Sequence, residues 1–152
     1  MPDLPVPAGE IQAVPGEVRI LDNGVPWIRT QRELLEEWTA VDEISATFLA
    51  GGRHWSDLDG VELYVAGMWA SARWTLGIDP DAPVTSKPRA VTGAAIRKEL
   101  SWAEMCVASR LDGWECTTGT LNWLLWITGG REDMLWPDRF AAQATARRRT
   151  IT

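Results

Sequence analysis

Five carboxylates near the starts of two predicted helices come nearest to the residue types and spacing of a catalytic or metal site. Asp57, Asp59 and Glu62 belong to the first group, and Asp112 and Glu115 stand at matching places in the second. Paired carboxylates on facing helices build dimetal centres, but those centres also use histidine in a Glu-x-x-His arrangement. The chain has a single histidine. We therefore expect no metal site and no cofactor.

The one histidine, His54, is followed closely by Ser56, a pairing that could in principle join a base to a nucleophile. A serine just before a helix also satisfies free backbone N–H groups as a cap, and we expect this structural role for Ser56. The sequence contains no P-loop, dinucleotide-binding, zinc-protease or EF-hand pattern. It therefore predicts a protein that is not an enzyme.

Ten tryptophans make the composition unusual. Four fall on or beside apolar helix stripes and are expected in the core: Trp38, Trp74, Trp123 and Trp126. Others stand at element ends or in loops, where an indole either anchors a protein contact or folds back over the core, and the sequence leaves both readings open. The tryptophans of this second set, our first interaction candidates, are Trp27, Trp55, Trp114 and Trp136.

Charge is spread unevenly along a chain whose formal net charge is −6. An acidic balance argues against nucleic-acid backbone as the main partner. Acids gather in the first predicted helix and arginines at the C-terminal end, so we expect complementary contacts with a protein partner or with a second copy of the chain. The residues concerned are Glu36, Glu37 and Glu43 in the helix, and Arg147, Arg148 and Arg149 in the tail.

A motif of Ser, Leu, Asp, Gly and Glu occurs at residues 56–62 and again at 109–115, each time followed by Gly, Trp and Gly. A duplicated helical hairpin explains the recurrence, and two helices with shared capping chemistry are the alternative. A glycine inside a helix costs about 1 kcal/mol relative to alanine, a cost that close approach of a second backbone would explain. The glycines expected at helix contacts are Gly60, Gly67, Gly113 and Gly119.

Apolar residues at helical spacing predict five helices. Thr30 and Glu33 form a capping box that opens the first helix, and Thr92 is the expected cap of the third. The boundary near Ser109 decides whether the third and fourth helices are separate or fused. The predicted spans are 31–50, 56–77, a third from residue 92, 110–128 and about 137–148.

The predicted fold is all-α, with two pseudo-repeated helical hairpins forming a four-helix bundle. Residues 1–29 form an N-terminal arm and a short β-ribbon around Asn23 and Gly24, a pair that favours a hairpin turn. The bundle occupies residues 30–130, with repeat units at about 30–77 and 92–129. A C-terminal helix and basic tail follow at 131–152.

Arginine outnumbers lysine thirteen to two, and asparagine occurs twice. In this composition the chain resembles small helical proteins of actinobacteria and their phages, a resemblance that no motif carries and that assigns no residue a role. We expect non-enzymatic protein–protein association, with an assembly or virion-associated subunit as the favoured form. An inhibitor that binds a host or defence enzyme through an acidic helical face is the alternative. A helical ligand-binding protein or enzyme with a pocket between the repeats is the third.

Both cysteines are expected to be reduced and packed as small hydrophobic residues, because the protein is expected in the cytoplasm, or on a virion if a phage encodes it. No apolar run reaches the length of a membrane span, so no membrane partner is expected.

Overall fold

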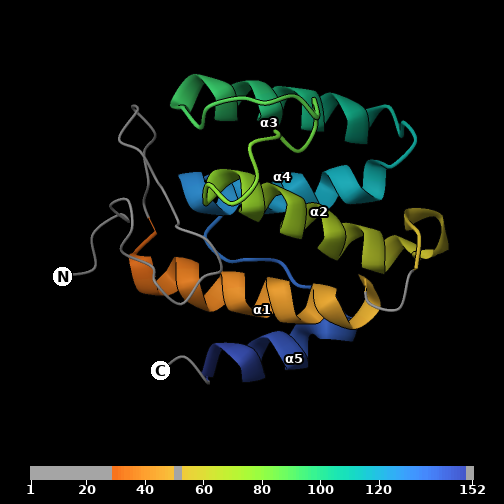
Figure 1. Cartoon of the computed structure of the whole chain (residues 1–152), viewed down its shortest axis with the longest axis vertical. Coiled ribbons are helices and arrows are strands. Elements are labelled where there is room, and N and C mark those ends of the chain that lie inside the picture. The colour runs from red at the N-terminus through yellow and green to blue at the C-terminus, as the bar shows by residue number, and fades with distance from the viewer. Residues whose placement is uncertain (1–28, 50–52, 150–152) are drawn as a thin grey trace.

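The computed structural model describes residues 29–49 and 53–149, and within them the chain is all-α. Figure 1 shows α3 on one side, α2 and α4 in the middle, then α1, with α5 on the far side. A short 3-10 turn, η1 (Trp55–Asp57), precedes α2. The helices are α1 (Gln31–Leu49), α2 (Gly60–Thr75), α3 (Gly93–Ala108), α4 (Trp114–Thr128) and α5 (Asp138–Arg149).

No strand occurs in the described residues, whose only β-type pairing is one bridge between Asp81 and Pro88. The expected β-ribbon falls almost wholly on residues 1–28, which lie outside the described part of the chain. No helix among the described residues has the length and apolar character needed to cross a bilayer.

Helices α2 and α4 meet at two glycines. A Cβ atom at Gly67 would lie 1.8 Å from the carbonyl oxygen of Cys116, and one at Gly119 would lie 1.8 Å from that of Tyr64. Each carbonyl belongs to the residue three places before the opposite glycine, so the contact is reciprocal. Across it, the Thr120 hydroxyl donates to the Gly67 carbonyl at 3.2 Å. The two backbones can approach this closely because neither glycine carries a side chain.

The first and third helices begin at the expected caps. The Thr30 hydroxyl accepts from the Glu33 amide at 3.1 Å, and the Glu33 carboxylate accepts from the Thr30 amide at 3.0 Å. These two bonds are the predicted capping box. Thr92 accepts from the Ala95 amide at the start of α3.

The cap of α2 differs from the prediction. Asp59, not Ser56, accepts from the Glu62 amide, and the Glu62 carboxylate accepts from the Asp59 amide. Ser56 lies exposed in η1. The helix starts later because residues 55–57 turn as a 3-10 helix, which leaves Asp59 as the last extended residue before α2.

Helices α3 and α4 are separate, and Ser109, at the boundary left open by the sequence, is the C-terminal cap of α3. The chain reverses through Arg110, at φ 51°, and Gly113, at φ 81°. Gly113 is the N-cap of α4 and makes no side-chain cap bond. It was wrongly expected at a helix contact, because no described residue other than its chain neighbours has a heavy atom within 4 Å of where its Cβ would stand. The left-handed backbone conformation at position 113 explains why a glycine occurs there, because glycine tolerates this conformation best.

The core contains the tryptophans expected there. Trp38, Trp74, Trp123 and Trp126 are all buried. The indole N–H of Trp123 donates to the Thr75 hydroxyl at 2.8 Å, which adds a second polar link between α2 and α4. Helix α5 packs against α1, and its buried residues Phe140 and Ala144 join the apolar cluster around Ile44 and Phe48.

Candidate functional site

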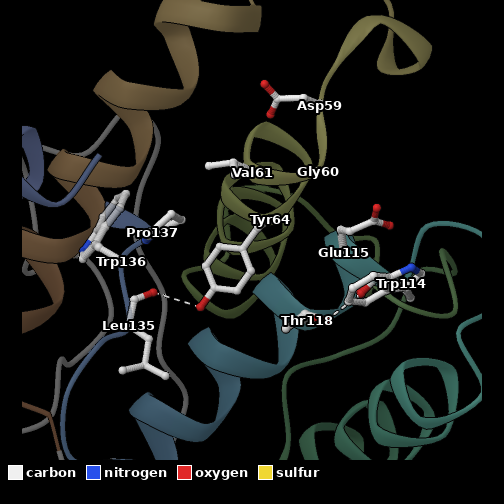
Figure 2. Close-up of a pocket in the computed structure, with 10 residues that line it drawn as sticks. All are labelled: Asp59, Gly60, Val61, Tyr64, Trp114, Glu115, Thr118, Leu135, Trp136 and Pro137. Atoms are coloured by element: carbon white, nitrogen blue, oxygen red, sulfur yellow. Dashed lines mark hydrogen bonds between the residues drawn. The ribbon is translucent and has the colours of Figure 1, made fainter. Parts of the chain in front are cut away.

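A pocket of about 590 Å³ lies between the N-terminal halves of α2 and α4. Figure 2 shows Tyr64 in its middle, Trp114 on one side, and Trp136 with Pro137 on the other. Its lining is mostly aromatic and aliphatic. The residues are Asp59, Gly60, Val61 and Tyr64 at α2; Trp114, Glu115 and Thr118 from α4; and Leu135, Trp136 and Pro137 from the segment before α5.

The segment that forms the third wall of the pocket is held by a buried asparagine. Asn122, on α4, donates to the Leu135 carbonyl at 3.0 Å, and its side-chain oxygen accepts from the Leu135 amide at 3.2 Å. Arg131 donates to the same oxygen at 2.8 Å. The Tyr64 hydroxyl also donates to the Leu135 carbonyl, at 2.9 Å. These bonds fix Leu135 and its neighbours against α2 and α4.

Sequence reasoning missed Asn122 as a residue that shapes the site. A signal was present, because Asn122 is one of two asparagines in the chain and stands in the most apolar helix. A fully buried amide must find hydrogen-bond partners, so its position indicated that a polar backbone segment would pack against α4.

Two of the tryptophans proposed as contact anchors line this pocket. Trp136 is half-buried, and its indole N–H donates to the Glu37 carboxylate at 3.1 Å. Trp114 is also half-buried, and the Cζ of Arg110 lies 4.1 Å from its ring centroid. A guanidinium over an indole is a cation–π contact. The two rings come from opposite sides of the pocket (Figure 2).

The carboxylates around the pocket differ in their partners. Asp59 forms an ion pair with Arg139, and its pKa is lowered first by the hydrogen bond from the Glu62 amide and then by Arg139. The pKa of Glu62 is lowered mainly by its hydrogen bonds from Arg53. Both carboxylates therefore stabilise local structure.

Glu115 makes no hydrogen bond or ion pair with any residue that the structure describes. Its Cγ and one carboxylate oxygen lie 3.5 Å from where a Cβ at Gly60 would stand, an ordinary packing distance. Gly60, expected at a helix contact, therefore faces a side chain of α4 and not the backbone of another helix. Glu115 is thus the pocket's uncommitted charge among the described residues.

The remaining interaction candidates lie elsewhere. Trp27 is outside the described residues, as are the side chains of Trp55, Arg148 and Arg149. The tail arginine Arg147 does meet Glu43, at 2.7 Å, but within one chain, so this pair is no argument for a second copy.

Glu36 and Glu37 line a second hollow, of about 530 Å³, beside Arg29. Arg29 donates to three backbone carbonyls, those of Trp126, Arg131 and Glu132, and its Cζ lies 4.8 Å from the Trp126 ring centroid. These contacts hold the start of the described chain against the end of α4. We therefore explain the hollow beside Arg29 by a structural role of this arginine.

The carboxylates first considered for metal chemistry do not converge. In the described residues, no group of three or more His, Cys, Asp or Glu side chains is placed to hold a metal ion. The Asp57 side chain accepts from the His54 amide at 3.1 Å, which closes the turn before α2. No protein-family model, no curated protein and no solved structure matches this chain, so any functional argument depends on the site itself.

Proposed function

We propose that this protein works by binding another protein, and that the pocket between α2 and α4 is the contact site. The observation that carries the proposal is the placement of Trp114 and Trp136 on opposite sides of one apolar pocket. Tryptophan is prominent among the residues that dominate binding energy at protein interfaces. Leu135, which is 50% exposed, extends the apolar surface at the rim.

The chemistry of the lining supports binding over catalysis. As far as the described residues go, the lining includes no histidine, cysteine, serine or lysine. The two hydroxyls, on Tyr64 and Thr118, each donate to a backbone carbonyl. Burial raises the pKa of Tyr64 to about 12, so the phenol stays protonated at neutral pH and is a poor candidate for a base.

Site-specific photo-crosslinking tests the proposal. A photoreactive phenylalanine analogue replaces Leu135, at the pocket, or Trp102, an exposed control on α3 that is 42% exposed. The full chain is produced in its source organism and irradiated. We expect a discrete crosslinked partner from position 135 and not from position 102, and loss of that product when Thr118→Trp fills the pocket.

Equal crosslinking at both positions, or none at position 135, would contradict the proposed contact site. Mass spectrometry of the product distinguishes a different protein from a second copy of this chain. A second copy would support the assembly form of the proposal, and a host enzyme would support the inhibitor form.

A further inference from the structure

The hydrogen-bond donors that line the pocket are largely committed to the protein itself. The Tyr64 hydroxyl donates to the Leu135 carbonyl at 2.9 Å, and the Thr118 hydroxyl donates to the Trp114 carbonyl at 2.7 Å. The indole N–H of Trp136 donates to Glu37. Of the lining side chains, Trp114 alone keeps an N–H with no partner among the described residues. A ligand that must accept hydrogen bonds would therefore find few side-chain donors.

The pocket's remaining capacity for polar contacts is to accept hydrogen bonds through a negatively charged group. The Glu115 carboxylate is uncommitted among the described residues, and Asp59, which also lines the pocket, carries a second carboxylate that is paired with Arg139. Among the residues that the structure describes, no basic side chain lines the pocket. Aromatic faces add to the attraction for a cation, because the ring quadrupole is negative over the face.

We infer that the pocket takes an arginine side chain of the partner protein, with its guanidinium at Glu115 and its methylene stem against the aromatic lining; this inference rests on the proposed function. Arginine suits the site because its planar head stacks on aromatic rings and pairs with carboxylates through two parallel hydrogen bonds. Its apolar stem covers hydrophobic surface while its charge stays near solvent.

Within the part of the chain that the structure describes, an arginine lies over a tryptophan ring three times. Arg29 lies over Trp126, Arg73 over Trp69, and Arg110 over Trp114, with Cζ-to-centroid distances of 4.8, 4.6 and 4.1 Å. Arg110 is not part of the pocket lining.

Peptide titration of the isotope-labelled full chain tests the inference. The probe is a blocked pentapeptide, Gly-Leu-Arg-Leu-Gly, and its comparison peptide carries citrulline, which is neutral but nearly identical in shape, in place of arginine. Binding is followed by the indole N–H signals of Trp114 and Trp136 in NMR spectra. We expect both signals to shift with the arginine peptide, and about tenfold weaker binding of the citrulline peptide, since hydrogen bonds to charged groups discriminate by at least this factor.

The matched variants are Glu115→Gln, which removes the uncommitted charge, and Glu104→Gln, which removes an exposed acid on α3 outside the pocket. Glu115→Gln should weaken the arginine peptide about tenfold and leave the citrulline peptide unchanged. Glu104→Gln should change neither. Glu115→Gln should melt only slightly below the wild type, because an acid in the first turn of a helix makes a small favourable contribution through the helix dipole. Binding of the arginine peptide should also weaken as salt increases.

Equal binding of the two peptides, unaltered binding by Glu115→Gln, or no shift of either indole signal would overturn the inference. These outcomes separate it from the proposed function. If position 135 crosslinks to a partner protein but the two peptides bind equally, the proposed protein association stands and the arginine site is wrong. If the arginine peptide binds specifically and through Glu115 but no protein is crosslinked, the cation site stands and the proposed partner protein is wrong.

Discussion

The reciprocal glycine contact between α2 and α4 predicts that Gly67→Ala destabilises the protein. A Cβ essentially never comes within 3.0 Å of such atoms, and the new methyl would lie 1.8 Å from the Cys116 carbonyl oxygen. The new methyl carbon and the Cys116 carbonyl oxygen must therefore move apart by at least 1.2 Å, the difference between those distances, and the helices that carry them must shift. The obstructing atoms belong to helix backbone, so no side-chain rotation relieves the overlap.

The expected loss follows from three contributions. Overpacking of this kind costs roughly 1–3 kcal/mol. Separation also breaks the buried bond from Thr120 to the Gly67 carbonyl, now 3.2 Å long, which contributes about 1 kcal/mol. Alanine regains about 1 kcal/mol of helix propensity. The net loss is about 1–3 kcal/mol, and the upper end is expected because rigid backbone cannot adapt. For a chain of this size, 3 kcal/mol corresponds to a fall of about 6–12 °C in Tm.

Circular dichroism melting and urea unfolding measure the effect, with Gly60→Ala as the matched control. A Cβ at Gly60 would lie 3.5 Å from the Glu115 side chain, an ordinary contact. The control should therefore melt at or slightly above the wild-type temperature, because alanine loses less conformational entropy on folding. A Gly67→Ala variant as stable as this control would refute the reasoning.

The double variant Gly67→Ala/Gly119→Ala gives a further check. Once the helices have separated to admit one methyl group, the second meets less resistance, so the combined loss should be smaller than the sum of the single losses. Strict additivity would indicate two independent effects instead of one shared contact.

Further outcomes are expected from the caps, the carboxylates and the buried thiol. Thr30→Ala should lower the free energy of unfolding by about 1 kcal/mol, as measured in urea. Asp59→Ala should do the same, whereas Ser56→Ala should leave it unchanged. The pKa values of Asp59 and Glu62 are lowered in the folded state, so the contribution of these carboxylates to the free energy of unfolding is complete above their ordinary pKa values of 3.8 and 4.5 and is lost as the pH falls further. Urea midpoints measured from pH 7 to pH 3 follow this loss. Asp59→Ala should make the decline shallower. Burial raises the pKa of the Cys116 thiol to about 11, so iodoacetamide at pH 8 should label it slowly when native and rapidly in urea, as followed by mass spectrometry.

Local signals in the sequence determined most of the helices. The first helix was expected at 31–50 and occupies Gln31–Leu49, and the last was expected at about 137–148 and occupies Asp138–Arg149. Apolar spacing and side-chain caps such as Thr30 and Thr92 act within a few residues along the chain, so they can be read without knowledge of the fold. Interior glycines also pointed to the place where two helices meet.

The same short motif acts differently in its two places, and only the tertiary structure decided this. In Asp59-Gly60 the aspartate caps α2, whereas in Asp112-Gly113 the glycine is the N-cap of α4 with left-handed backbone. The direction from which the chain enters a helix selects the capping residue, and that direction depends on the packing of the preceding segment. The shared sequence motif was therefore not a guide to shared capping geometry.

The candidate site also depended on tertiary structure. Trp114 and Trp136 were contact candidates by sequence, but nothing local indicated that they would face one pocket. They do so because Asn122 and Tyr64 hold the Leu135 backbone against α2 and α4. Glu115, considered for metal chemistry by sequence, became the uncommitted charge of an apolar pocket. Which groups of the pocket remain without partners is settled only when every element has packed, because bonds such as those of Tyr64 to Leu135 and of Trp136 to Glu37 join residues that are distant in sequence.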